Sequence, residues 1–211
     1  MSEAALLKLQ HWLSPAFPVG AFAYSHGLER AVAAGWVKDR KSLRQWLASL
    51  VTAGSLKSEA VLFAAAWKAA AARDDALLAE IAELAEALAP SAERRLETMA
   101  QGEAFAAALG TPPRPWPVAV AGAAAGEGLA LKVALAAFLQ AGVVNLASAA
   151  QRTIPIGQKD ALAVVDALRP DILAIAQWAE GSGLDDLGSA SLLSDIASMQ
   201  HEAQETRLFR S

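Results

Sequence analysis

The chain has 211 residues, of which 55% are hydrophobic and 19% charged, with a formal net charge of −4 at pH 7. A chain this apolar can bury enough surface to offset the entropy of ordering it, which excludes an intrinsically disordered protein. The net negative charge provides no basic field for a phosphate backbone, so no nucleic acid ligand is expected. Alanine and leucine dominate the apolar residues, which predicts an all-α single-domain bundle of roughly 8–10 helices over residues 1–211, without significant sheet.

Polar capping residues and chain breakers divide the first half into predicted helices. Asp39 is placed to cap a helix that ends at Gly54. Asp74 precedes a second helical run, and Ser91 caps a third that extends to about Leu109. In the first of these helices the apolar residues recur at amphipathic spacing: Leu43, Trp46, Leu47, Leu50 and Val51.

The run TPPRPWP is the strongest breaker in the chain, because proline removes amide donors and fixes φ. It predicts an extended connection between two helical halves. A short helix is expected from about Val118, and a long apolar one over residues 129–151, which we interpret as a core helix rather than a membrane span. A further helix is expected to end at Leu168, and Pro170 to occupy the first turn of the next.

The sequence carries no recognisable catalytic or metal-binding motif. It lacks cysteine and has only three widely spaced histidines, His11, His26 and His201, so neither a disulfide framework nor a structural zinc site is expected. No phosphate loop, nucleophile elbow or zincin motif occurs. The N-terminus lacks the basic start and small-residue cleavage site of a signal peptide. We therefore expect a cytoplasmic protein that is not an enzyme and has no cofactor.

The segment from Ser14 to Glu29 contains residues that a simple core helix would not need. Pro15 and Pro18 rigidify its entry, Gly20 is expected to start a helix, and Gly27 lies at helical spacing, where glycine costs about 1 kcal/mol relative to alanine. One interpretation is helix packing against the two glycines, with ordinary surface residues between them. The other is an exposed patch for a partner, formed by Pro18, Gly20, Tyr24, Ser25, His26, Gly27 and Glu29.

The last part of the chain, residues 184–211, is too polar for a core and too apolar for a free tail, so we expect it to dock on a partner. Near its end two arginines bracket two large apolar residues, a composition found at interface hot spots. The alternative is a frayed basic terminus. The candidate partner-binding residues here are His201, Glu202, Arg207, Leu208, Phe209 and Arg210.

Several motifs resemble those of the urease accessory protein UreF family. The matching stretches follow the family order over essentially the whole chain: Pro15-Ala-Phe-Pro18-Val-Gly20, Tyr24-Ser25-His26-Gly27-Leu28-Glu29, Ile154-Pro155-Ile156-Gly157-Gln158 and Arg207-Leu208-Phe209-Arg210-Ser211.

The resemblance implies a non-enzymatic cytoplasmic chaperone for nickel insertion into urease. Its partners would be a UreD/UreH-type accessory protein, a UreG-type GTPase and apo-urease, with this chain as a homodimer. One alternative is a regulator of the GTPase, in which Arg207 or Arg210 acts in trans on GTP hydrolysis. Another is a nickel binder that uses His26 or His201.

Overall fold

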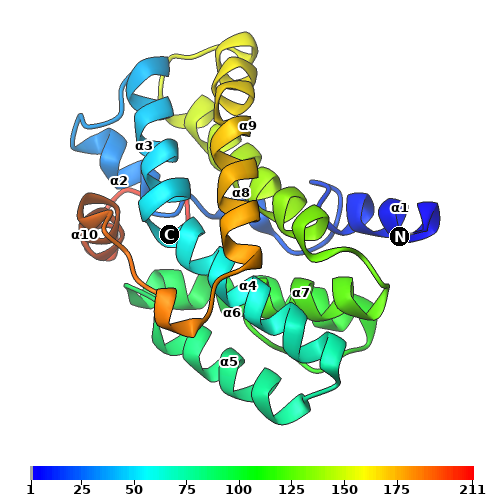
Figure 1. Ribbon diagram of the computed structural model, residues 1–211. Coiled ribbons are helices and arrows are strands. Elements are labelled where there is room, and N and C mark those ends of the chain that lie inside the picture. Colours follow the sequence, from blue (N-terminus) through cyan, green and yellow to red (C-terminus); the bar gives the residue numbers. More distant parts are fainter. Residues whose placement is uncertain (1) are drawn as a thin grey trace.

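A computed structural model describes residues 2–211, which form ten α-helices and two short 3₁₀ helices, with no strand among them (Figure 1). The all-α prediction is confirmed. In chain order the elements are α1 (Glu3–Trp12), η1 (Ala21–Ala23), α2 (Leu28–Ala33), α3 (Arg40–Ala53), α4 (Ser55–Ala72), α5 (Asp75–Ala87), α6 (Ala92–Leu109), α7 (Trp116–Gly126), α8 (Leu131–Thr153), α9 (Gln158–Glu180), η2 (Leu184–Asp186) and α10 (Leu192–His201).

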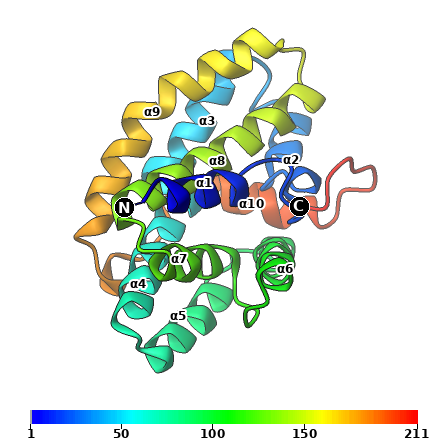
Figure 2. The same cartoon turned by 90° about the vertical axis from the view of Figure 1, so that its right-hand side faces the viewer.

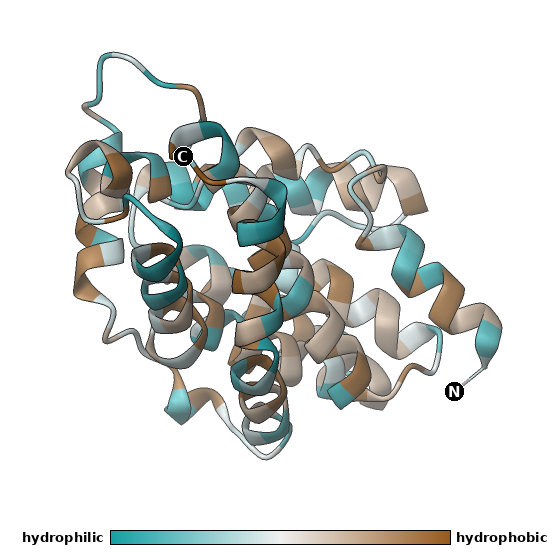
Figure 3. Ribbon diagram, turned by 90° about the horizontal axis from the view of Figure 1, so that it is seen from above, coloured by the Kyte–Doolittle hydropathy of each residue, from teal (hydrophilic) through white to brown (hydrophobic). Residues whose placement is uncertain are grey.

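Helix α8 runs through the middle of the bundle. Helices α3 and α9 pack on one side of it, while α4 to α7 form the other side, and α10 lies beside α2 at one end (Figure 2). Pale and brown residues predominate in the central helices, while teal and brown residues alternate along the helix at the N-terminus (Figure 3). The α10 end of the bundle thus brings together α2, α6 and α10, which are far apart in the sequence.

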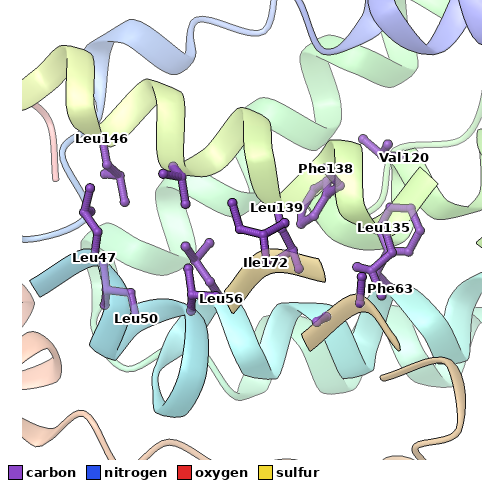
Figure 4. Packing of buried hydrophobic residues seen from close by; sticks show 14 of the residues in the cluster. Leu47, Leu50, Leu56, Phe63, Val120, Leu135, Phe138, Leu139, Leu146 and Ile172 are labelled. Carbon is purple, nitrogen blue, oxygen red and sulfur yellow. The ribbon is translucent and has the colours of Figure 1, made fainter. Parts of the chain in front are cut away.

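Large side chains of α8 fill the space between the two sides. Leu146 points toward Leu47 and Leu50 of α3, while Phe138 meets Phe63 of α4 with ring centroids 5.1 Å apart (Figure 4). Burial of such side chains stabilises the fold by about 1.5–3 kcal/mol each. This packing explains why α8 is apolar around most of its circumference.

Two stretches are long and apolar enough to cross a membrane by composition alone: α8, and α3 with α4 taken together. About half of the most apolar 18-residue window of each is buried inside the bundle, 50% in α8 and 56% in the other stretch. Core helices of a bundle pass the same compositional test, and this burial agrees with the interpretation of α8 as a core helix.

The predicted helix caps are confirmed. Asp39 forms a capping box with Ser42, whose backbone N–H donates to Asp39 Oδ1 (2.8 Å). The side chains of Asp74 and Ser91 accept hydrogen bonds at the starts of α5 and α6. Each cap satisfies an N–H group that a helix start leaves without a partner, and each therefore marks a boundary that local sequence determines.

Two predicted boundaries in the second half are wrong. Helix α9 continues without a break from Gln158 to Glu180 and contains Pro170. Both Pro170 and Asp166, whose carbonyl loses its donor there, are exposed, so water can replace the missing hydrogen bond. Helix α7 begins at Trp116, because Pro117 lies in its first turn, where its missing N–H costs nothing.

The extended segment after α6 crosses back over that helix at Gly102. A Cβ placed on Gly102 would lie 1.8 Å from the carbonyl oxygen of Arg114, whereas one on Gly122 of α7 would meet nothing within 4 Å. Glycine is therefore required at position 102, because the backbone of Arg114 approaches it closely.

This difference gives a matched pair of substitutions. Gly102→Ala should lower the free energy of unfolding by about 1–3 kcal/mol or more, because the backbone must move apart. Gly122→Ala should leave it unchanged or raise it by up to about 1 kcal/mol, because alanine is the better helix former. Urea unfolding followed by circular dichroism measures both, and equal effects would contradict the crossing.

Candidate partner-docking site

After α10 the chain folds back over α2 and α6 as residues 202–211, which we call the tail. The Arg210 N–H donates to the carbonyl of Ala23 (2.8 Å), and the Ser25 N–H donates to the carbonyl of Ser211 (3.0 Å). The two segments singled out in the sequence therefore lie against each other. The tail is not a frayed terminus, because its backbone is paired with residues about 190 positions earlier.

The carboxylate of Glu29, in the first turn of α2, fastens the middle of the tail. It accepts hydrogen bonds from the backbone N–H groups of Leu208 (2.7 Å) and Phe209 (2.9 Å). Its Oε2 also lies 3.2 Å from Nε2 of His201, the last residue of α10. One side chain thus ties together α2, α10 and the tail.

The carboxylate of Glu93, in the first turn of α6, forms a second anchor. Its Oε2 lies 2.6 Å from Nδ1 of His201, and its Oε1 accepts from Nη1 of Arg207 (2.6 Å). His201 is fully buried, so both of its ring nitrogens depend on these protein partners. Arg207 is held by an intramolecular ion pair.

Glu97, one turn further along α6, holds the end of the tail. It accepts from the Ser211 hydroxyl (2.6 Å) and pairs with the guanidinium of Arg94, which also pairs with Glu59 (2.8 Å). Burial raises the pKa of Glu97, but Arg94 and the nearby His26 lower it more, so its pKa lies well below the usual range. Glu97 is therefore a buried carboxylate in its charged form.

Aromatic contacts complete the attachment of the tail. Phe209 is buried, and the guanidinium of Arg152 lies 4.3 Å from its ring centroid. Tyr24 is buried beneath Arg210, whose guanidinium lies 5.7 Å from the phenol ring. Burial raises the pKa of Tyr24, and the charge of Arg210 partly opposes this effect. The Arg210 side chain itself is exposed.

The expectation that residues 24–26 are exposed is wrong for the folded chain. Tyr24, Ser25 and His26 are all buried, because the tail covers them. Ser25 also donates its hydroxyl to the carbonyl of Ser211. In the folded chain these residues support the tail.

Neither glycine of this segment lies inside an α-helix. Gly20 and Gly27 have left-handed φ angles of 69° and 76°, preceding η1 and α2 respectively. A Cβ on Gly27 would lie 2.9 Å from the backbone nitrogen of Ser198 in α10, while one on Gly20 would meet nothing within 4 Å. The backbone that approaches Gly27 is thus that of α10, which favours the packing interpretation at this position.

The other predicted residues are exposed, and one of them also makes a hydrogen bond that supports the fold. Pro18 and Glu202 are exposed, and Glu202 accepts a hydrogen bond from the Ala92 N–H at the start of α6 (2.7 Å). Leu208 is exposed beside the buried Phe209. Sequence reasoning missed Glu93 and Glu97 of α6, which receive the tail. Glu97 belongs to a polar stripe at i, i+3, i+4 and i+7 on a buried helix face: Arg94, Glu97, Thr98 and Gln101.

A cavity of about 960 Å³ adjoins the inner side of this cluster, between α1, the loop after it and α8. Its walls are largely apolar and include Trp12, Phe17 and Phe138, while Arg94 and Glu97 lie among its polar lining. In residues 2–211, no group of three or more acidic or histidine side chains is arranged to hold a metal ion.

Known proteins resemble the whole chain. Urease accessory protein UreF 1 of Brucella anthropi is 49% identical over 220 aligned residues, covering 100% of this chain and 96% of the relative. Urease accessory protein UreF of Agrobacterium fabrum is 49% identical over 218, covering 99% and 97%. A family model described as UreF matches residues 37–169, more than half of the chain. The chain belongs to the UreF family. The family resemblance seen in the sequence is thereby confirmed, and this UreF-family chain is a urease accessory protein.

The two glycines provide a test of the α2 and α10 contact. Gly27→Ala and Gly20→Ala carry the same left-handed strain, about 1–2 kcal/mol, but only the former places a methyl group against α10. We expect Gly27→Ala to lower the hydrogen-exchange protection of α10 amides much more than Gly20→Ala. Equal protection of α10 in the two variants would contradict the contact.

Proposed function

We propose that this chain acts as a chaperone in the cytoplasm for nickel insertion into urease, bridging a UreD/UreH-type accessory protein and a UreG-type GTPase on apo-urease. Nickel is the cargo of this assembly, and the chain performs no chemistry of its own. By holding GTPase and apoenzyme together, it would raise their effective concentration without any new catalytic group.

The observation that carries this proposal is the orientation of α10. A surface helix normally turns its apolar stripe toward the core. Helix α10 does the opposite, because its buried residues are small or polar while its large apolar residues face outward with exposed fractions between 41% and 69%. The buried set is Ser194, Ala197, Ser198 and His201, and the exposed set is Leu192, Leu193, Ile196 and Met199.

The tail adds to this apolar surface from the same end of the bundle. Leu208 is 60% exposed, while its neighbours Arg207 and Phe209 are fixed by Glu93 and by burial. Apolar side chains on a surface whose backbone is already ordered bind a partner with little further entropy cost. We therefore infer that α10 and the tail form the docking surface for the UreD/UreH-type partner.

The assembly we propose contains two copies of this chain, each presenting one docking surface. The partner would then link each surface to apo-urease, and the helical body would remain free for the GTPase. The contribution of this chain is binding energy, which places the metal-carrying GTPase beside the empty urease site.

A second candidate function rests on Arg210. Its guanidinium is exposed over Tyr24, whereas that of Arg207 is paired with Glu93. An exposed arginine that stabilises transition-state charge in trans would make the chain a regulator of GTP hydrolysis. Arg210→Ala distinguishes the two functions: a catalytic arginine would lose stimulated hydrolysis with binding intact, and an adaptor arginine would lose complex formation first.

Substitutions on α10 test the docking surface. Ile196→Glu should abolish co-elution with the UreD/UreH-type partner, because a charge would be buried in the interface. Phe209→Ala should do the same by releasing the tail, with the helical circular dichroism nearly unchanged. Leu162→Glu on α9, where the leucine is 55% exposed, is the matched control and should preserve co-elution.

Reconstitution then tests the function itself. Apo-urease, the other accessory proteins, nickel and GTP would be mixed with the wild-type chain, with Ile196→Glu or without the chain, and urea hydrolysis assayed. Full activation by Ile196→Glu, or without the chain, would contradict the proposed role.

A further inference from the structure

His201 is the only one of the three histidines with a carboxylate oxygen near each ring nitrogen. Nδ1 lies 2.6 Å from Glu93 Oε2, and Nε2 lies 3.2 Å from Glu29 Oε2. The imidazole has no exposed surface, so water cannot supply a missing donor or acceptor.

The two contacts determine the protonation form of the ring. An ionised carboxylate can only accept hydrogen bonds, and a neutral imidazole has only one N–H to donate. With both carboxylates ionised, the two contacts are satisfied together only by the imidazolium form, which donates from both nitrogens. We propose that His201 is held as an imidazolium between Glu29 and Glu93, and that this proton fastens α10 and the tail to α2 and α6.

The charges around His201 support the same form. Helix α2 contributes Glu29, while the neighbouring Arg30 donates a hydrogen bond to Gln200 (3.0 Å). Helix α6 contributes Glu93, and on the same helix Arg94 forms an ion pair with Glu97. The tail contributes Arg207, and Glu202 of the adjoining turn is exposed on the start of α6. With an imidazolium, the charges of Glu29, Glu93, His201 and Arg207 cancel. Without it, this cluster carries an excess negative charge, which is costly away from water.

The contacts of the other two histidines differ from those of His201. His26 Nδ1 lies 3.4 Å from Glu97, and its Nε2 lies 2.8 Å from the hydroxyl of Ser55, which can donate as well as accept. Only one nitrogen of the His26 ring therefore faces a carboxylate. His11 is exposed.

Loss of the proton would weaken the attachment of the tail. One ring nitrogen would then present a lone pair to a carboxylate, and the two groups would repel each other. If the repelled carboxylate is Glu29, its hydrogen bonds to the Leu208 and Phe209 amides weaken. If it is Glu93, its ion pair with Arg207 weakens. Loss of either ring proton would therefore loosen the tail from the body. Its effect on partner docking rests on the proposed function, whereas the proton site does not.

Ring-nitrogen NMR of the ¹⁵N-histidine-labelled full chain at about pH 7 tests the proposal directly. The His201 ring should carry an N–H at both nitrogens, together with protected amides at Leu208 and Phe209. A His201 ring with one unprotonated nitrogen would overturn the proposal.

Two glutamine variants give a matched comparison. Glu29→Gln supplies an amide that can donate to Nε2, so the His201 ring should lose its proton at that nitrogen. Glu202→Gln, at the exposed neighbour, should leave both ring protons in place, and two retained ring protons in Glu29→Gln would count against the proposal. If a variant does not fold, the wild-type spectrum still decides. If the His201 ring is doubly protonated as proposed but the chain does not co-elute with the partner, only the docking function is refuted.

Discussion

The carboxylate of Glu29 is the contact on which the α2 and α10 end of the molecule depends. It receives two backbone amides of the tail and faces His201, so α2, α10 and the tail share one acceptor. Without it, the Leu208 and Phe209 amides would lack partners and His201 would lose one of its two. The tail over Ser25 and His26 would then be held by Glu93, by Glu97 and by its backbone contacts at Ala23 and Ser25.

A buried cluster of this kind adds more to positional accuracy than to stability. Removing these carboxylates, the guanidinium of Arg94 and two histidines from water costs free energy that their mutual contacts only partly recover. An apolar tail of similar size would bind the body as strongly, but without a fixed register. The charged contacts allow one placement of Leu208 and Phe209, and that placement is what a protein partner would recognise.

Local signals were sufficient for the helices and insufficient for the site. The caps at Asp39, Asp74 and Ser91 act within one turn, so sequence alone located them. The burial of residues 24–26 depends on a tail about 185 residues later, and no local pattern encodes that contact. The continuity of α9 through Pro170 depends on solvent at that position. The polar stripe of α6 was visible, but a solvated face would have produced the same pattern.

The approach of α10 to Gly27 links the buried cluster to the exposed surface. Because glycine has no side chain, the backbone of Ser198 can lie directly against α2, and this contact selects small residues on the inner face of α10. It also brings His201, one turn later, between Glu29 and Glu93. The large apolar residues of α10 have only the outer face left to occupy. The arrangement that buries His201 is therefore also the one that leaves Ile196 on the outer surface.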